Sequence, residues 1–311
     1  MPSSRTQRPD HVEPHGQSPW HPHVPPDGGD IPPTHWLLHS HAAHGQRPWR
    51  NGGVEMGSSA GRLGREARHR VLVPAEAVQG DVVTITEPGR VHHLSDVLRV
   101  KVGERVACFD GEGRAWVGPL IRRARRELVV QIEERVIEPD AACRIRLLQA
   151  LIKPERFDWL VQKATELGVE RIVPVMTARA QARLPQGRAA EKTTRWQRIA
   201  EEAATQCGRL RLPVIEPPQP FERLWTSRER AEWAIIPTLA VEAAPLREVL
   251  LSQGRVAEAA VWIGPEGDFT EAEVEMAVAH GARPVSLGTR VLKSETAALV
   301  TLAVLTQCLE S

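Results

Sequence analysis

The sequence contains no tyrosine and only 4 phenylalanines, and its 4 cysteines lie far apart. Cys108, Cys143, Cys207 and Cys308 form no CxxC pair, which excludes the redox and zinc motifs that such pairs build. The pattern predicts four reduced, mostly buried thiols. No apolar run reaches the roughly 18 residues of a membrane helix, and no charged-then-apolar signal peptide opens the chain. We therefore expect a cytoplasmic protein without a membrane partner.

The usual nucleotide-binding and hydrolase loops are absent as well. No GxGxxG, P-loop or GxSxG motif occurs, which disfavours a dinucleotide-binding Rossmann enzyme, a P-loop NTPase and an α/β-hydrolase. The formal net charge is +1, so the chain has no global basic field. Any surface that binds nucleic acid therefore has to be a local cluster of positive side chains.

Residues 1–65 differ in composition from the rest of the chain. They are rich in Pro, His, Gly and Ser, and they hold 8 of the 12 histidines. A metal-binding tail is one interpretation, but the histidine spacing is irregular and no cysteine or carboxylate cluster joins it. We favour a disordered extension, because this composition cannot bury enough apolar surface to offset its ordering entropy. A third reading places the start of translation near Met56, which the intact mass of the native protein would decide.

Between residues 66 and 140 the pattern is that of a small β-barrel. Short β-branched runs at 71–73, 81–85, 104–109 and 127–132 are separated by turn signals such as Asp110-Gly111-Glu112-Gly113. Residues 92–100 have the pattern of a short helical insert. Closely spaced strands with few helices are typical of small barrels.

From residue 141 to 311 strands alternate with helices, which predicts a parallel α/β sheet. Gly168 ends one predicted helix, Thr270 and Glu273 form a capping box at another, and Ser294 is a candidate N-cap of the last. The predicted strands are 145–152, 171–175, 234–237, 260–263 and 284–287, and the predicted helices are 157–167, 191–207, 244–253, 270–280 and 294–309.

Three loops in this region follow predicted strands. The first runs from Ile263 to Thr270 and contains two glycines and a proline; the second, from Leu287 to Ala298, is too long and too apolar for a plain turn. Pro237-Thr238 is a third candidate. Loops that leave the carboxyl ends of neighbouring parallel strands form the usual ligand crevice of α/β proteins. Each loop alone could be a well-packed turn, but the set favours a ligand site.

These loops resemble a known family. Gly264-Pro265-Glu266-Gly267, followed by Leu287-Gly288-x-Arg290-Val291-Leu292-x-x-Glu295-Thr296-Ala297, is similar to the signature of the knotted SPOUT methyltransferases. The stretches 157–168, 195–209 and 93–100 extend the resemblance, which covers about residues 66–309, to the bacterial ribosomal RNA small subunit methyltransferase E family. Two positions depart from its usual pattern: Asp268 stands where a second glycine is usual, and Lys293 where arginine is frequent.

The resemblance implies a fold and an activity. The fold is α/β, with a disordered tail at 1–65, an RNA-binding PUA-like β-barrel at 66–140, and a SPOUT domain with a parallel sheet and a C-terminal trefoil knot at 141–311. The activity is methylation of N3 of uracil 1498 in 16S ribosomal RNA with S-adenosylmethionine, by a homodimer acting on the assembled small subunit. The implied cofactor-binding residues are Pro237, Thr238, Gly264, Pro265, Glu266, Gly267, Leu287, Gly288, Val291, Leu292, Thr296 and Ala297.

Candidate roles in chemistry follow from charge. Lys293 and Arg290 could stabilise a uridine anion, whereas Glu295 could be a general base or could interact with the dipole of its helix, which we favour. No residue set suggests a metal. Two alternatives stay open: a related SPOUT enzyme with another RNA target, and a non-catalytic RNA-binding or assembly protein. The residues predicted to contact RNA phosphates are Arg122, Arg123, Arg125, Arg126, Arg183 and Arg209.

Overall fold

The computed structural model describes residues 54–55, 67–180, 187–226 and 231–309. The expected N-terminal extension, apart from residues 54–55, and Arg183 lie outside the described residues. The described chain forms two separate sheets of 8 strands each. No described helix is both long enough and apolar enough to cross a lipid bilayer.

The first sheet is mixed and surrounds an apolar core. It contains all four strands predicted in this region, with bounds that differ by one to two residues, but four further strands, the long β6 and the shorter β1, β3 and β8, were not predicted. β6 was missed because Gly118-Pro119 reads as a turn and two arginines, Arg122 and Arg123, lie near its end. The strands are β1 (Val54–Glu55), β2 (His69–Leu72), β3 (Val78–Gln79), β4 (Val82–Ile85), β5 (Arg105–Phe109), β6 (Arg114–Ala124), β7 (Glu127–Gln131) and β8 (Glu134–Ile137).

The helical insert of the barrel begins earlier than predicted. Helix α2 (Pro88–His92) starts after Glu87, whose carboxylate accepts hydrogen bonds from the amides of Gly89 at 3.1 Å and Arg90 at 3.2 Å. A carboxylate N-cap followed by proline in the first turn is a strong start signal, and it fixes the helix four residues ahead of the predicted bound. The chain then continues as a single π-helical turn, η2 (His93–Val97).

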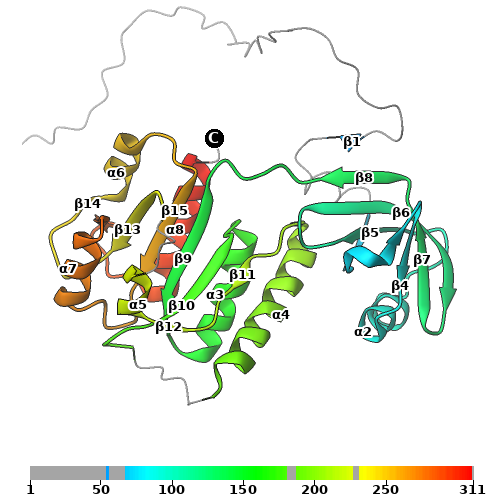
Figure 1. The fold of residues 1–311 in the computed structure, drawn as a ribbon, viewed down its shortest axis with the longest axis horizontal. Helices are drawn as coiled ribbons and strands as arrows, with labels where there is room; N and C mark the ends of the chain where they lie inside the picture. Colours follow the sequence, from blue (N-terminus) through cyan, green and yellow to red (C-terminus); the bar gives the residue numbers. More distant parts are fainter. Residues whose placement is uncertain (1–53, 56–66, 181–186, 227–230, 310–311) are drawn as a thin grey trace, which may run out of the picture. The chain divides into compact units, whose positions relative to one another are not determined.

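The second sheet is parallel throughout, as predicted. Its order is β11-β10-β9-β15-β13-β16-β14, with β12 also paired to β10, so that β15, β13 and β16 are neighbours. The strands are β9 (Arg144–Ala150), β10 (Arg171–Met176), β11 (Val214–Ile215), β12 (Gln219–Pro220), β13 (Trp233–Pro237), β14 (Ala244–Pro245), β15 (Glu258–Ile263) and β16 (Ala282–Ser286) (Figure 1).

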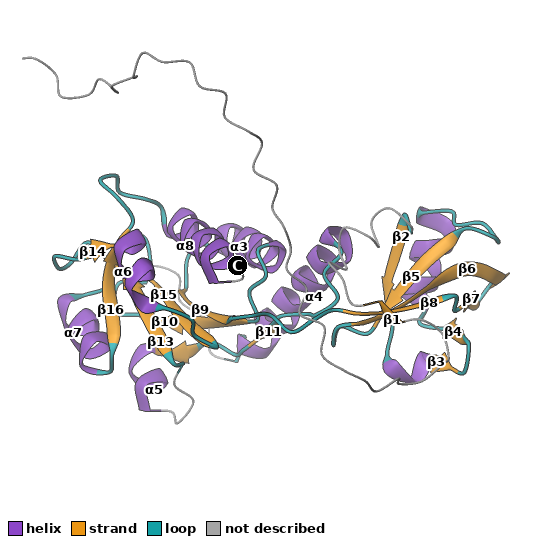
Figure 2. Cartoon of the chain, turned by 90° about the horizontal axis from the view of Figure 1, so that it is seen from above, coloured by secondary structure: helices purple, strands orange, loops and turns teal. Residues whose placement is uncertain are grey.

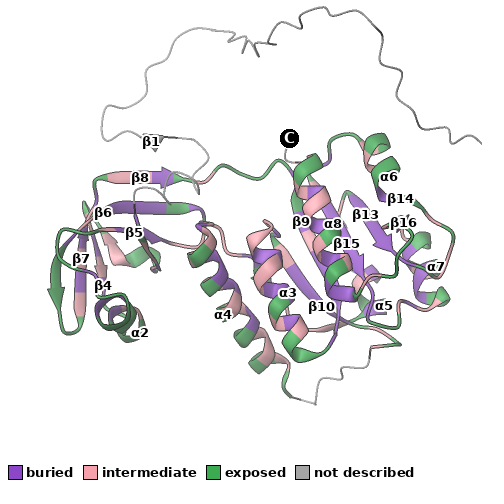
Figure 3. Ribbon diagram, turned by 180° about the vertical axis from the view of Figure 1, so that it is seen from behind, coloured by how far each residue is buried: buried purple, intermediate pink, exposed green. Residues whose placement is uncertain are grey.

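Helices cover both faces of this sheet (Figure 2). On one face α3 (Pro154–Glu166), α4 (Ala189–Cys207), α6 (Leu246–Gln253) and α8 (Ser294–Leu309) pack around a core that includes Leu147, Phe157 and Leu302. On the other face α5 (Phe221–Thr226) and α7 (Glu271–Ala279) pack against Trp262 and Phe269. Figure 3 shows the buried strands between helices whose outer sides are exposed.

The helix boundaries test three specific predictions. Gly168 and Gly208 are left-handed, with φ of +89° and +85°, and they end α3 and α4. The Thr270–Glu273 capping box of α7 is present in both directions. The prediction for Ser294 is wrong: it is the first residue of α8, and its hydroxyl donates to the carbonyl of Gly264 instead of accepting from its own helix.

The segment after α4 joins the α/β part to the barrel. Leu210 is 1% exposed and packs among Phe109, Val117 and Val136, which are barrel residues. The amide of Leu212 donates to the carbonyl of Gly111 at 2.8 Å. The junction therefore combines one buried apolar side chain with a backbone hydrogen bond.

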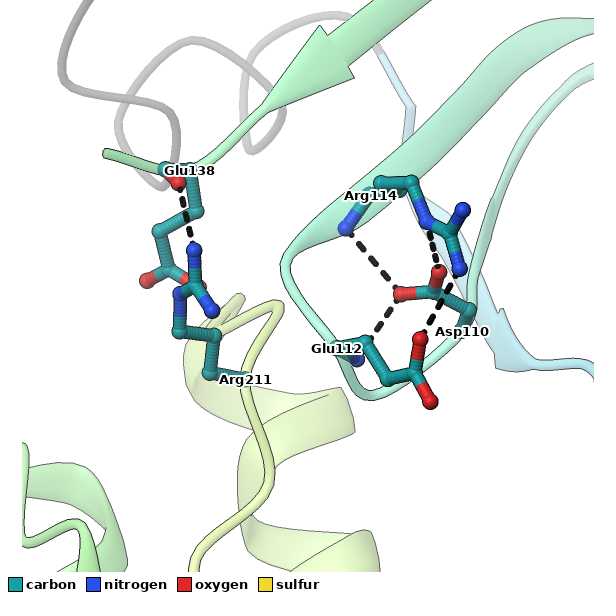
Figure 4. A network of polar contacts seen from close by, with 5 residues as sticks. All are labelled: Asp110, Glu112, Arg114, Glu138 and Arg211. Atoms are coloured by element: carbon teal, nitrogen blue, oxygen red, sulfur yellow. Dashed lines mark hydrogen bonds and ion pairs between the residues drawn. The ribbon is translucent and has the colours of Figure 1, made fainter. Parts of the chain in front are cut away.

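Charged side chains complete that junction (Figure 4). Arg211 donates to the carbonyl of Glu138 at 3.2 Å. In the adjacent hairpin, Asp110 accepts from Arg114 Nε at 2.5 Å and raises the pKa of that guanidinium, first through this hydrogen bond and then through charge attraction. Arg114 also donates to Glu112 at 2.9 Å. The turn that meets Arg211 is thus held by its own ion pairs.

The cysteines are only partly as predicted. All four are free, but only Cys108 and Cys143 are buried, whereas Cys207 is half-buried and Cys308 is exposed. Burial raises the pKa of the Cys108 thiol to about 12, which keeps it protonated and unreactive. Cys308 lies on the exposed side of α8.

Gly118 in β6 allows a close approach of two strands, and this generates a stability prediction. A Cβ at this position would lie 1.8 Å from the backbone carbonyl oxygen of Gln131. Gly118→Ala should therefore lower the free energy of unfolding by about 2 kcal/mol or more, because the neighbouring strand would have to shift. Urea-induced unfolding followed by circular dichroism measures the change.

Gly267→Ala is the matched control for this variant. Its Cβ would meet its nearest atom, Cβ of Arg179, at 3.5 Å, which is ordinary van der Waals contact. Its unfolding free energy should stay close to that of the unchanged protein. Equal stability of the Gly118→Ala variant and the unchanged protein would contradict the close approach of β6 and β7.

Candidate functional site

A hollow lies at the carboxyl ends of β13, β15 and β16. Its cavity volume is about 90 Å³, and it is partly open to solvent. The three loops singled out in the sequence all contribute, because their strands are neighbours in a parallel sheet. The lining consists of Pro237, Thr238, Leu239, Ile263, Gly264, Pro265, Glu266, Asp268, Leu287, Gly288, Arg290, Val291, Leu292, Ser294 and Ala297.

The rim of the hollow is apolar and its charged groups are few. Leu239 and Val291 are 64% and 79% exposed, which is unusual for large aliphatic side chains. Glu266, Asp268 and Arg290 supply the charge. A flat or apolar ligand group can cover the two aliphatic side chains.

A buried hydrogen-bond junction lies at the base of the hollow. Ser294, 5% exposed, donates to the carbonyl of Gly264 at 2.5 Å and accepts from Gln149 Nε2 at 2.8 Å. Gln149 is fully buried at the end of β9 and also donates to the carbonyl of Ala150 at 3.0 Å. One side chain therefore ties the start of α8 to two strand ends.

Asp268 connects two of the three loops. Its Oδ2 accepts from the hydroxyl of Thr238 at 3.0 Å and from the amide of Leu239 at 2.7 Å. Its Oδ1 accepts from the amide of Phe269 at 2.8 Å. The backbone of Asp268 is left-handed, with φ of +59°.

Arg156 lies between two carboxylates from different loops. Its guanidinium is 3.7 Å from Glu266 and 3.7 Å from Glu295. Glu295 is 9% exposed and occupies the first turn of α8, and its Oε2 has no hydrogen-bond partner among the described residues. Arg156 comes from the first turn of α3, directly after β9, so it reaches the same edge of the sheet.

The loop after β10 supports the 264–270 loop from another side. Arg179 Nη1 donates to the carbonyls of Gly267 and Phe269, both at 3.1 Å. The amide of Ala178 donates to Glu273 at 2.8 Å. Glu273, 5% exposed, is thus shared between the capping box and this second loop.

The predicted cofactor-binding residues converge on the hollow with two exceptions. All of them line it except Gly267, which faces Arg179, and Thr296, which is exposed on α8. Among the candidates for chemistry, Arg290 lines the hollow and is exposed, Lys293 is exposed beside it, and Glu295 is buried against Arg156.

The described arginines that were predicted to contact RNA come from two parts of the chain. Arg122, Arg123, Arg125 and Arg126 lie in and beside the turn between β6 and β7, and the last three line a hollow next to α2 and η2. Two of them have partners in the barrel: Arg122 pairs with Glu127 at 3.2 Å, and Arg123 donates to the carbonyl of Ser95 at 2.9 Å. Arg209 is half-buried and donates to the carbonyl of Thr165 at the end of α3, at 3.1 Å.

Sequence reasoning missed the connecting residues of the site. Gln149 and Arg156 were not singled out, Arg179 was considered only as a basic residue for RNA contact, and Asp268 was noted only as a departure from a pattern. A signal for Arg156 does exist, since it lies in the turn that follows a strand of the same sheet edge. Gln149 could also have been found, because a polar residue in the strand Ile145–Ile152 needs a buried partner.

Two models of protein families match the chain. The model described as an RNA methyltransferase domain matches residues 139–306, and the model described as an RNA methyltransferase PUA domain matches residues 85–133. The first spans the parallel sheet with its helices, and the second falls within the barrel.

Curated relatives match over most of the chain. A protein of Synechocystis named ribosomal RNA small subunit methyltransferase E is 32% identical over 245 residues, which cover 78% of this chain and 78% of that protein. The protein of the same name from Bacillus subtilis is 27% identical over 218 residues, covering 68% of this chain and 85% of its own length.

Solved structures share the fold. The Neisseria gonorrhoeae protein of the same name, crystallised bound to S-adenosyl methionine, is 27% identical with a TM-score of 0.68, over 78% of this chain and 98% of that chain. A structure from Legionella pneumophila in complex with the bound cofactor SAM is 30% identical with a TM-score of 0.68, over 76% and 96%. The predicted fold class, a parallel α/β domain with a PUA-like barrel, is confirmed.

Removing the Ser294 hydroxyl tests the junction at the base of the hollow. Ser294→Ala removes the donor to the Gly264 carbonyl and one of the two acceptors of the Gln149 amide, so it should lower the free energy of unfolding by about 1–3 kcal/mol. Chemical denaturation measures this change. Ser252→Ala is the control, because that exposed hydroxyl makes only a local bond to Val249 within its own helix. A Ser294→Ala variant as stable as the control would contradict the buried junction.

Proposed function

The chain belongs to the ribosomal RNA small subunit methyltransferase E family, and from this premise we propose that it methylates N3 of a uridine, uracil 1498, in 16S ribosomal RNA, with S-adenosylmethionine as methyl donor. One observation supports this proposal above the others: the loops of the family signature, far apart in the sequence, line one hollow at the edge of a parallel sheet.

The hollow has the chemical groups that S-adenosylmethionine requires. Ile263, Leu287 and Leu292 provide apolar surface for a flat base, and exposed Val291 and Leu239 are side chains that a bound ligand would cover. Glu266 offers negative charge to a ligand that carries a sulfonium and an ammonium group, whereas the carboxylate of Asp268 is engaged by hydrogen bonds within the protein. The cofactor supplies an electrophilic methyl group when it is bound.

The residues of the chain then have to hold the uridine and stabilise the charge that forms when N3 loses its proton. Arg290 lines the hollow and is exposed, so it is well placed to stabilise that anion. Lys293 is the second candidate for the same task. We assign Glu295 a different role, because it is buried, interacts with Arg156, and lies where a carboxylate stabilises the N-terminus of α8.

RNA contact is proposed for the turn between β6 and β7. Arg125 and Arg126 are exposed there, beside Arg122 and Arg123, and together they form a local positive cluster on a chain of almost zero net charge. Such clusters bind phosphates irrespective of sequence. Arg183 and Arg209 stay in the proposal as secondary contacts.

Further parts of the proposal come from the family resemblance. They are a barrel domain at 66–140, a methyltransferase domain at 141–311 with a trefoil knot, a homodimer, the assembled small subunit as substrate, and a cytoplasmic location.

Calorimetry with S-adenosylmethionine, followed by mass mapping of 16S ribosomal RNA from a deletion strain, tests the proposed cofactor and the proposed methylation. The expected results are saturable binding and the loss of one methyl group from uracil 1498. Absence of cofactor binding would favour an RNA-binding or assembly protein, and loss of a methyl group elsewhere would indicate another target.

Substitution of Arg290 tests its role in charge stabilisation. Arg290→Ala should lower kcat by about 100-fold, since a group that stabilises developing charge acts mainly in the transition state, and leave the Kd of the cofactor almost unchanged. Lys293→Ala tells whether the second cation shares the task. Arg283→Ala, an exposed arginine of β16 outside the hollow, is the control. Unchanged turnover in both the Arg290 and Lys293 variants would contradict a catalytic cation in this loop.

The salt dependence of RNA binding tests the β6–β7 turn. If Arg125 and Arg126 each contact a phosphate, the slope of log K against log salt should fall by about 1 for each arginine replaced by alanine. Filter binding or fluorescence anisotropy with small-subunit RNA at several salt concentrations measures the slope. Arg255→Ala removes an exposed arginine elsewhere and serves as the control. A slope that stays the same in the double variant would exclude this turn from the RNA interface.

A further inference from the structure

Asp268 combines an unfavourable backbone with an unusually complete set of hydrogen bonds. Only two non-glycine residues among the described ones have positive φ, and Asp268 is one of them, at +59°. Aspartate tolerates this region better than most residues, but the conformation still costs energy that the surroundings have to offset. Three hydrogen bonds, at 2.7, 2.8 and 3.0 Å, converge on its carboxylate.

Two of these bonds connect segments that follow different strands. Thr238 and Leu239 follow β13, whereas Asp268 and Phe269 follow β15, so two of the bonds cross between loops 29 and 30 residues apart in sequence. Both loops line the hollow. The Thr238 hydroxyl in turn accepts from the amide of Ala240 at 3.0 Å, which extends the connection along the 238–240 segment.

A carboxylate that accepts amide hydrogen bonds forms stronger bonds than a neutral acceptor does. Thr238 is buried and its amide donates to the carbonyl of Val285 at 3.3 Å, and Ala240 packs against the core, but Leu239 between them is 64% exposed. Without the carboxylate, the side of the hollow that this segment forms would sample several conformations, and a ligand would have to order it on binding.

We propose that Asp268 is a positioning residue of the cofactor pocket: its carboxylate fixes the Thr238–Leu239 segment against the 264–270 loop, so that this wall of the pocket is formed before the ligand arrives. The proposal rests on the proposed function, since it names the cofactor as the ligand. Asp268 itself takes part in no bond-making step.

Three variants separate the parts of this role. Asp268→Gly accepts the left-handed backbone and removes all three hydrogen bonds. Asp268→Asn also accepts the backbone but offers one acceptor oxygen and no charge, so it should keep part of the connection. Glu271→Gln is the matched control, because it removes an exposed carboxylate nearby that does not line the hollow.

Hydrogen exchange of the ligand-free protein measures directly whether the Leu239 amide is hydrogen-bonded. The amide of Leu239 should exchange at least about tenfold faster in Asp268→Gly than in the unchanged protein, because its acceptor is gone, and Glu271→Gln should leave the rate unchanged. Unchanged protection of Leu239 in Asp268→Gly overturns the proposal, whatever the cofactor does.

Calorimetry then reads the consequence. Asp268→Gly should raise the Kd for S-adenosylmethionine by about tenfold, and Asp268→Asn should have a Kd between those of Asp268→Gly and the unchanged protein. The loss of affinity should be similar for S-adenosylhomocysteine, which lacks the sulfonium charge. The KM for the cofactor should rise while kcat at saturation changes little.

Equal affinity of all variants for the cofactor overturns the positioning role. A loss of affinity confined to the ligand with the sulfonium charge also overturns it, because Asp268 would then be a counter-charge. An unchanged protein that does not bind the cofactor overturns the proposed function and the positioning role together, whereas binding that is insensitive to Asp268 overturns only the latter.

Discussion

The geometry of the candidate site depends on the two buried hydrogen bonds of the Ser294 hydroxyl. The hydroxyl bonds to the carbonyl that follows β15 and to Gln149 at the end of β9, and it does so at the first residue of α8. A parallel sheet alone brings strand ends to one edge, but it does not fix the loops that leave them. Since the bonding groups are buried, their alternative is an unsatisfied polar atom rather than a bond to water.

Charge around the hollow is arranged in connected pairs. Arg156 contacts carboxylates on two loops, Arg179 donates to two carbonyls of the 264–270 loop, and Asp268 accepts from the segment after β13. Each of these side chains comes from a different strand end or helix start. The site is therefore supported from several sides, whereas the groups that face the ligand space, such as Arg290 and Val291, are exposed.

The sequence predicted the elements far better than it predicted the connections between them. Helix limits set by local chemistry, such as Gly168 and the Thr270–Glu273 capping box, are encoded within four residues and were found. β6 was missed because Gly118-Pro119 imitates a turn, although the glycine serves a close strand approach. The partners of Asp268 and Arg156 lie about 30 or more residues away, so only the folded chain reveals them. The convergence of the three loops could be predicted, because it follows from strand order and direction alone.

Leu210 has a consequence for how the chain gains and loses its structure. It belongs by sequence to the turn after α4, yet it is buried among the side chains of the barrel. A chain cut at residue 140 would leave this leucine without its apolar surroundings on one fragment and a gap in the core of the other. Heat or denaturant should therefore unfold the barrel and the parallel sheet in one cooperative transition rather than two.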